Sequence, residues 1–271
     1  MPPDIGAVER IHPKMLATTT PPVIAVVNQK GGVGKTTTAI NLGAALAELG
    51  HRTLLVDLDP QANSTSGLGL DPSRIRLNIY HLLTGEAGLD QIAQPTGVPN
   101  LSLVPSHIDL AGAEIELAAI SSRETLLRKA LSAPEPGIEC VIIDCPPSLG
   151  LLTLNALTAA TSMLIPTQCE YFALEGLRHL MYTHQLVRSG LNPKLVIAGI
   201  VMTQFDARTT LSWDVLESVR RSYPNDVLTT LIPRNVRISE APSHGKSVID
   251  YDPTCRGAIA YRALAKELLE R

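Results

Sequence analysis

The stretch that decides the fold is Val23-Ile24-Ala25-Val26-Val27-Asn28-Gln29-Lys30-Gly31-Gly32-Val33-Gly34-Lys35-Thr36-Thr37. A short apolar run leads into a glycine-rich turn, and a helical pattern follows directly from Thr36. This is the strand–loop–helix arrangement that holds phosphate groups, because glycines let backbone N–H groups turn toward an anion and the helix adds its positive N-terminal end. The stretch therefore predicts an α/β domain that binds a nucleotide.

The polar residues of this loop have expected roles in ATP binding. We expect Lys35 to hold the β- and γ-phosphates and the Thr36 hydroxyl to coordinate Mg²⁺. Gln29 departs from the usual pattern, which has a glycine five residues before Gly34, and a second lysine, Lys30, directly precedes the glycine pair. The other residues expected to line the ATP site are Gly31, Gly32, Val33, Gly34 and Thr37.

Acidic residues follow two of the expected strands. One strand ends at Asp57-Leu58-Asp59 and another at Asp144, and ligands of open α/β sheets bind beyond the carboxyl ends of strands. Asp144 suits an outer-sphere contact to Mg²⁺, which keeps its waters and recruits few carboxylates. Asp57 and Asp59 are two residues apart at the end of one expected strand, so both carboxylates can lie near this edge. We therefore expect one of them to support the metal and the other to reach the γ-phosphate and orient water.

Short apolar runs alternate with longer amphipathic ones from Val23 onward. Continuous apolar runs are typical of strands buried on both faces of a parallel sheet. The expected strands are Val23–Asn28, Thr53–Leu58, Leu101–Val104, Cys140–Asp144, Ser162–Thr167, Leu195–Thr203 and Val227–Ile232. The expected helices are Thr36–Leu49 (with Gly50 as its C-cap), Glu124–Leu131, Leu151–Ala160, Ala173–Arg188, Leu211–Tyr223 and Arg256–Leu269. We predict a single doubly wound, mostly parallel sheet flanked by helices.

The composition excludes several classes of protein. The chain has 271 residues, of which 45% are hydrophobic and 18% charged, so it is neither disordered, collagenous nor coiled-coil. Its four cysteines show no CxxC or other metal-ligand pairing, which favours a reduced cytoplasmic protein. The sequence contains no run of about 18 apolar residues, so it predicts no membrane span. Residues 1–22, rich in Pro and Thr, lack the apolar run of a signal peptide and are expected to form a disordered tail before a domain at 23–271.

Together the motifs resemble those of the ParA/Soj chromosome- and plasmid-partitioning ATPases, within the deviant-Walker group that includes MinD. The segments that carry the resemblance are Lys30–Thr37, Asp57–Asn63, Ile143–Ser148, Cys169–Glu175, Phe205–Thr209 and Ile232–Lys246. The resemblance covers the chain from about residue 22 to the C-terminus, and its last segment, IPRNVRISEAPSHGK, is similar to the Soj branch in particular. The fold that it implies is that of a deviant Walker P-loop NTPase.

The resemblance also implies an activity and a set of partners. It implies a Mg²⁺-dependent ATPase that forms a homodimer when ATP is bound, with Lys30 of one subunit reaching the nucleotide of the other. A cation supplied in this way is useful because charge spreads over the γ-phosphoryl oxygens in the transition state. The resemblance assigns hydrolysis to Asp59, the Walker B role to Asp144, and the adenine side of the site to the loop that contains Pro233 and Asn235. It further implies a ParB-type centromere-binding protein that stimulates hydrolysis.

Basic residues are concentrated in one part of the chain. The net charge of −3 argues against coating nucleic acid through bulk charge, but residues 178–246 carry 9 basic and 5 acidic side chains, whereas residues 1–177 carry 10 and 17. The DNA-contacting residues of the family correspond to Arg208 and Arg237, with Lys246 as a further candidate. Such residues contact phosphates and would give nonspecific binding to double-stranded DNA, which places the protein on the nucleoid. The alternative interpretation is a solvated face or pairing with neighbouring acids.

Three other functions share the phosphate loop. A MinD-like membrane-positioning ATPase needs a basic C-terminal helix with bulky apolar residues, whereas residues 257–271 are Ala-rich and have no Phe or Trp. A reductase like the nitrogenase iron protein needs two positioned cysteines, and only Cys145 directly follows the Walker B Asp144. A small-molecule ligase, such as a biotin-pathway enzyme, needs a substrate pocket that no motif here indicates. We expect a partition ATPase and keep the MinD-like protein as the alternative.

Overall fold

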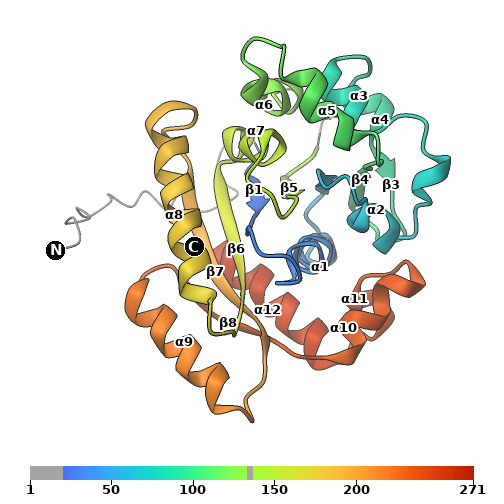
Figure 1. Ribbon diagram of the computed structural model, residues 1–271. Helices are drawn as coiled ribbons and strands as arrows, with labels where there is room; N and C mark the ends of the chain where they lie inside the picture. Colours follow the sequence, from blue (N-terminus) through green and yellow to red (C-terminus); the bar gives the residue numbers. More distant parts are fainter. Residues whose placement is uncertain (1–20, 133–136) are drawn as a thin grey trace.

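Eight strands form one sheet in the computed structural model, which describes residues 21–132 and 137–271 (Figure 1). The strand order is β3-β4-β2-β5-β1-β6-β7-β8, and every neighbouring pair is parallel except β3 and β4. The strands are β1 (Val23–Val26), β2 (Thr53–Asp57), β3 (Gln94–Pro95), β4 (Leu101–Val104), β5 (Cys140–Asp144), β6 (Ser162–Gln168), β7 (Val196–Phe205) and β8 (Val227–Pro233). The sheet extends on both sides of β1, with β5, β2, β4 and β3 on one side and β6, β7 and β8 on the other, which confirms the predicted doubly wound sheet.

Helices cover both faces of this sheet. They are α1 (Lys35–Glu48), α2 (Asn63–Gly67), α3 (Ile79–Thr84), α4 (Leu89–Ile92), α5 (Leu110–Leu117), α6 (Leu126–Ala130), α7 (Leu151–Ala159), α8 (Ala173–Gly190), α9 (Thr210–Ser222), α10 (Val236–Glu240), α11 (Val248–Tyr251) and α12 (Arg256–Glu270), with 3₁₀ turns η1 (Pro72–Arg74), η2 (Arg123–Thr125) and η3 (Ala241–His244). Helices α1 and α12 pack together on one face. Helices α3 and α5 to α9 cover the other face.

The alternation of side chains along β1 divides the core into two layers. Ile24 and Val26 belong to the layer under α1 and α12, whereas Val23 and Ala25 belong to the opposite layer. All four are buried. A strand with apolar residues on both faces can lie only in the middle of a covered sheet, and this central position places the phosphate loop that follows β1 at the centre of the carboxyl edge.

The predicted strands and helices are confirmed, with ends that differ by no more than two residues. The C-cap of α1 is Leu49 rather than the predicted Gly50, and Gly50 follows it with a φ of +94°, the position where glycine commonly ends a helix. The predictions missed β3 and the helices α2 to α5, α10 and α11. These elements have two to eight residues each, which is too short for a hydrophobic period to stand out from a loop.

Two glycines bring the segment after α2 against the end of η3. A Cβ built on Gly245 would lie 2.7 Å from Gly69 Cα, and a Cβ on Gly69 would lie 3.2 Å from the Gly245 carbonyl oxygen. Both glycines have positive φ, +84° for Gly69 and +64° for Gly245. The contact is between two backbones, so no flexible side chain can move aside to admit a larger residue.

We predict that Gly245→Ala destabilises the fold more than Gly50→Ala. Both substitutions place alanine at a positive φ, which costs about 1 kcal/mol, but nothing lies within 4 Å of a Cβ at Gly50. Overpacking against the Gly69 backbone should add about 1–3 kcal/mol in the Gly245 variant. Urea unfolding of both variants measures the difference. Equal losses in the free energy of unfolding would show that the two backbones can separate without cost.

Candidate nucleotide-binding site

The phosphate loop lies between β1 and α1 and leaves the N-terminus of α1 uncapped. Gly32 and Gly34 have φ values of +75° and +89°, a region that only glycine adopts freely. Gly34 is the N-cap of α1 and no side chain accepts a hydrogen bond from the first turn. The N–H groups of that turn have no partner within the helix, so the 14-residue helix presents them, with its positive dipole end, to an anion.

Lys35 folds back over the loop that precedes it. Its side chain is buried, and Nζ donates a hydrogen bond to the Lys30 carbonyl oxygen at 3.0 Å. Burial lowers the pKa of Lys35, while the neighbouring carboxylates Asp144 and Asp59 act in the opposite direction. A partly desolvated ammonium group beside a phosphate loop is suited to hold phosphate oxygens, as the sequence predicts.

The carboxylate of Asp144 fits a magnesium site. Its Oδ2 accepts a hydrogen bond from Ser64 Oγ at 2.8 Å, and the Thr36 hydroxyl also donates to the carboxylate. Its other oxygen, Oδ1, is buried and has no hydrogen-bond partner among the described residues. An orphaned carboxylate oxygen beside a threonine hydroxyl matches the few protein ligands that Mg²⁺ takes. When bound, Mg²⁺ would neutralise phosphate charge, and Thr36 and Asp144 would hold it directly or through water.

Asp57 and Asp59 do not lie on the same element of the fold. β2 ends at Asp57, so Asp59 lies in the loop beyond it. Asp57 is fully buried and accepts hydrogen bonds from the Thr65 amide and hydroxyl at 2.8 and 2.7 Å and from the Asp59 amide at 3.2 Å. These donors occupy its oxygens, which corrects the expectation that either carboxylate could reach the γ-phosphate. Asp57 fixes the loop, and Asp59 is the remaining candidate.

Asp59 lies close to the nucleotide side of the site. It is 7% exposed, its Oδ1 accepts a hydrogen bond from the Gln61 amide at 2.9 Å, and its charge acts on both Lys35 and Asp144. The structure therefore brings together Lys35, Thr36, Asp59 and Asp144 from three strand ends. The role of Asp59 in hydrolysis stays a prediction.

Lys30 makes an ion pair within its own chain. Its Nζ contacts Glu170 Oε2 in the loop between β6 and α8, and both side chains are more than 40% exposed. The family resemblance implies that Lys30 reaches the nucleotide bound to a second subunit, and this stays a prediction. Glu170 had no assigned role, although it lies within the segment Cys169–Glu175 that carries the family resemblance.

The end of β7 also contacts the phosphate loop, which the sequence analysis missed. Thr203 Oγ1 donates to the Val33 carbonyl oxygen and Gln204 Nε2 donates to the Gly32 carbonyl oxygen, both at 2.8 Å. Pro233 and Asn235, expected near adenine, lie at the end of β8, which β6 and β7 separate from β1. Asn235 caps α10 by accepting a hydrogen bond from the Arg237 amide. Their contact with a nucleotide stays a prediction.

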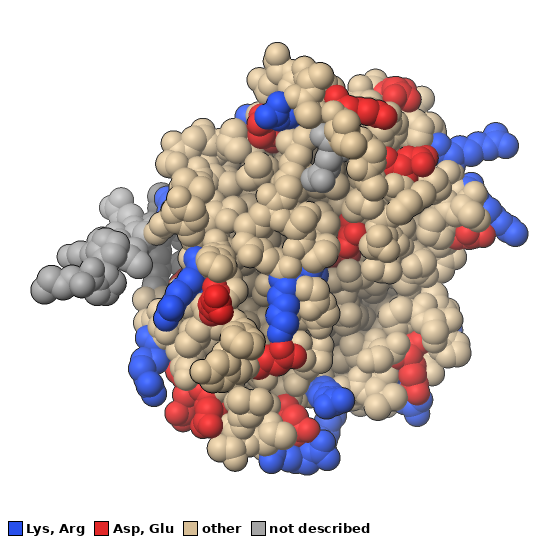
Figure 2. Space-filling model, viewed as in Figure 1, with Lys and Arg blue, Asp and Glu red and all other residues tan. Residues whose placement is uncertain are grey.

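The candidate DNA-contacting residues lie beyond two adjacent strands. Arg208 follows β7 and Arg237 follows β8, and the Arg234 amide donates to the Phe205 carbonyl oxygen between the two loops. Arg208 is 87% exposed and pairs with Asp206 at 2.7 Å, and Arg237 pairs with Glu240 and Asp252 at 2.9 and 3.3 Å. Lys246 follows η3 and is exposed. Figure 2 shows that Lys and Arg on this face lie mostly beside Asp or Glu, rather than in one large basic area.

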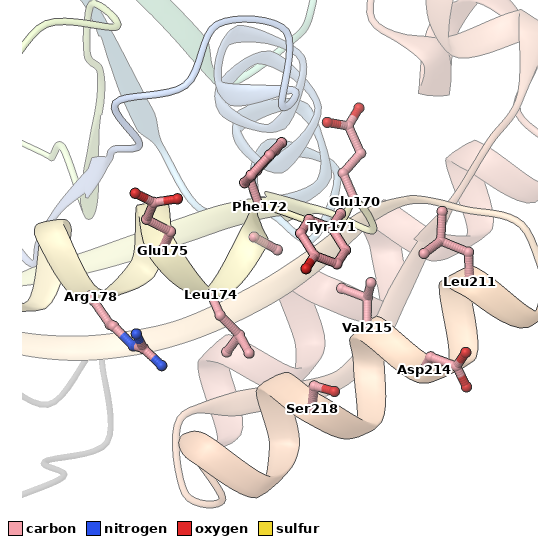
Figure 3. A pocket seen from close by; sticks show the side chains of 11 residues that line it. Glu170, Tyr171, Phe172, Leu174, Glu175, Arg178, Leu211, Asp214, Val215 and Ser218 are labelled. Carbon is pink, nitrogen blue, oxygen red and sulfur yellow. The ribbon is translucent and has the colours of Figure 1, made fainter.

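A hollow of about 530 Å³ separates the start of α8 from α9 (Figure 3). Leu174 of α8 points toward α9, and Leu211 and Val215 line the hollow from α9, with Tyr171 and Phe172 at the start of α8 also in its lining. Tyr171 is 82% and Phe172 63% exposed, which is unusual for large apolar side chains placed side by side. Glu170, which pairs with Lys30 of the phosphate loop, is among the residues that line the hollow. No helix in the described residues is long and apolar enough to cross a membrane.

Comparisons with known proteins assign this arrangement to a family. The AAA domain family model matches residues 22–197. The sporulation initiation inhibitor protein Soj of Bacillus subtilis is 54% identical over 246 residues, which are 91% of this chain and 97% of Soj. The chromosome partitioning protein ParA of Myxococcus xanthus is 51% identical, over 92% of this chain and 88% of that protein.

A solved structure with a bound nucleotide has the same fold. The cobyrinic acid a,c-diamide synthase of Mycobacterium smegmatis, with an ATP analogue and magnesium bound, superposes with a TM-score of 0.82 at 42% identity. The match covers 92% of this chain and 95% of that one. With a family model over most of the sheet and two relatives above 50% identity, the chain belongs to the ParA/Soj family of chromosome-partitioning ATPases.

Proposed function

We propose that this protein is an ATP-dependent switch for the segregation of chromosome or plasmid copies. It dimerises on ATP, binds double-stranded DNA nonspecifically as the dimer, and releases DNA after a ParB-type protein stimulates hydrolysis, so that it works in the cytoplasm on the nucleoid. The observation that carries the proposal is the convergence of Lys35, Thr36, Asp59 and Asp144 at the phosphate loop. Relatives named for chromosome partitioning, at higher identity than the synthase, favour this function over a small-molecule ligase.

The residues of the site divide the chemistry of hydrolysis among them. Lys35 and the N-terminal amides of α1 bind phosphate oxygens, and Thr36 and Asp144 would hold Mg²⁺, which would supply neutralisation of phosphate charge when bound. Asp59 orients the attacking water from the loop that Asp57 holds in place. Lys30 reaches the nucleotide of the second subunit, which requires its ion pair with Glu170 to open. Hydrolysis therefore depends on dimerisation.

DNA binding is proposed for Arg208, Arg237 and Lys246. Arg208 and Arg237 follow neighbouring parallel strands and so share the carboxyl edge of the sheet with the phosphate loop. Both pair with acids in the free protein, so phosphate must replace a carboxylate partner when DNA binds. Pairs this exposed contribute little to stability and exchange readily. They therefore leave the arginines available, and few contacts per subunit make binding depend on the dimer.

We predict that DNA binding requires ATP and changes in a different way in each of three variants. Lys35→Ala should abolish it by removing the phosphate ligand, Asp59→Ala should prolong it by blocking hydrolysis, and Arg208→Glu should weaken it by at least tenfold while dimerisation survives. Fluorescence anisotropy of a labelled duplex, titrated with salt under ATP, ADP and no nucleotide, measures the effect. Lys194→Glu, an exposed basic residue outside the proposed surface, serves as the control. Equal affinity with ADP and ATP at moderate salt would refute the switch.

An apolar rim, formed by Tyr171 and Phe172, lies beside the Lys30–Glu170 pair and favours the binding of a second copy of the chain at this edge. Tyr171 and Phe172 follow Glu170 directly, so any subunit that approaches Lys30 also meets these two rings. Their burial would contribute about 25 cal/mol for each Å² of apolar surface removed from water. We therefore propose that the rim forms part of the ATP-dependent dimer interface.

We predict that Phe172→Glu weakens ATP-dependent dimerisation by at least tenfold without reducing ATP affinity. The charge would be buried without a partner in the dimer, whereas the free chain keeps it in water. Tyr182→Glu is the matched control, since Tyr182 is also aromatic and, like Phe172, is 63% exposed. Tyr182 lies about 15 Å further along α8, away from the rim. Analytical ultracentrifugation in an Asp59→Ala background measures the dimer. Equal effects of the two substitutions would place the interface elsewhere.

The MinD-like alternative is less well supported by the C-terminal helix. Tyr261, Leu264 and Leu268 of α12 are buried, and α12 packs against α1 and β8. The apolar face that would enter a lipid surface is therefore part of the core. Sedimentation with anionic liposomes in the presence of ATP would support the alternative if the protein were recovered with the lipid.

A further inference from the structure

Gln204 has a strained backbone conformation near the end of β7. Its φ is +51°, in the left-handed region that residues other than glycine rarely adopt. The register of β7 against β8 shifts between Met202 and Phe205, so Gln204 lies at an irregularity near the end of the strand. The side chain itself is exposed. Strained, bulged residues of this kind often turn a side chain toward a functional site.

The side chain of Gln204 turns toward the phosphate loop. Its Nε2 donates to the Gly32 carbonyl oxygen at 2.8 Å, and its Oε1 accepts from Gln168 Nε2 at 3.0 Å. A carbonyl oxygen can only accept, which fixes the amide with its NH₂ group toward Gly32. Gln168, at the end of β6, then holds the other side of the amide. The neighbouring Thr203 makes a matching bond to the Val33 carbonyl oxygen.

These bonds determine which way two peptide groups of the loop face. The carbonyl and the N–H of one peptide unit point in opposite directions, because the unit is planar and trans. A donor outside the loop that holds the Gly32 and Val33 carbonyl oxygens therefore keeps the N–H groups of Val33 and Gly34 on the opposite side. Backbone N–H groups that converge on one point are the anion-binding element of a phosphate loop. The loop is thus ordered before a nucleotide arrives.

We propose that Gln204 is a positioning residue that pre-organises the phosphate loop for binding the phosphates of ATP and ADP. It touches the loop from the outside and does not reach the reacting atoms. Pre-organisation lowers the cost of ordering the loop at binding, so it acts on nucleotide affinity rather than on the chemical step. This inference rests on the proposed binding of ATP at the loop and adds a residue to that site.

The test compares Gln204→Met with Gln204→Gly by titration of a fluorescent ATP analogue and of ADP. Methionine keeps the length of the side chain and removes both hydrogen bonds, and we expect the Kd for both nucleotides to rise about fivefold, as for one lost hydrogen bond. Glycine also removes the bonds but tolerates the positive φ, so it should raise Kd to the same extent without lowering thermal stability. The rate of hydrolysis at saturating ATP should stay within about twofold of wild type.

Two controls separate this inference from the proposed function. Gln185→Met removes an amide from an exposed position of α8 and should leave the Kd unchanged. Gln168→Leu removes the hydrogen bond that holds the Gln204 amide and should reproduce part of the rise in Kd. A wild-type protein that binds no nucleotide would refute the proposed function itself. A wild-type protein that binds nucleotide, with Gln204→Met and Gln204→Gly variants whose Kd equals that of wild type, would overturn only the role of Gln204. A rise in Kd limited to one of the two variants would also overturn this role, because backbone strain or the packing of methionine would then explain the lower affinity.

Discussion

Two carboxylates that lie in register inside the sheet are the constraint around which the site is built. Asp57 of β2 and Asp144 of β5 are partners across adjacent parallel strands, and both are fully buried. Burial and the repulsion between them raise the pKa of Asp57, and burial raises that of Asp144 as well. Like charges in the interior are costly unless a proton or a cation compensates them. Thr65 and the Asp59 amide stabilise one carboxylate, whereas the other keeps a free oxygen beside Lys35 and Thr36. The site is therefore prepared for a divalent cation.

Parallel strands bring the other parts of the site to the same edge. The phosphate loop follows β1, the loop with Asp59 follows β2, and Glu170 follows β6, which pairs with β1 on its other side. The next two strands, β7 and β8, lead to the basic residues. β7 joins the two regions, since Thr203 and Gln204 contact the phosphate loop and Arg208 lies a few residues beyond. The carboxyl edge of the sheet therefore carries the phosphate loop and, next to it, the basic residues that follow β7 and β8.

The sequence predicts this edge better than it predicts what the side chains do there. The strands, the phosphate loop and the acidic strand ends follow from hydrophobic runs and from the spacing of glycine, lysine and threonine, which are local patterns. The partners of these residues depend on contacts between distant segments. The Lys30–Glu170 pair joins residues 140 positions apart, and the Gln204–Gly32 bond joins residues 172 apart. Asp57 is the clearest case, because the apolar run before it predicts its place at the end of a strand but not the donors that bond to its carboxylate. No local pattern marks a residue whose partner comes from another strand.

The charge of the chain sets how the nucleotide can control DNA binding. The net charge is −3, and Arg208, Arg237 and Lys246 provide only three proposed phosphate contacts in each subunit. The segment that carries Lys246 packs backbone to backbone against the segment after α2, and the Val248 amide donates to Asn41 of α1 at 2.7 Å. Contacts this close hold the basic segment and the nucleotide elements as one unit, so a rearrangement within a subunit is not needed. Under the proposed function dimerisation would be sufficient, because doubling three phosphate contacts would change the slope of log affinity against log salt from about −2.7 to about −5.4. On that proposal a weakly acidic subunit would leave DNA at physiological salt, whereas its dimer would stay bound.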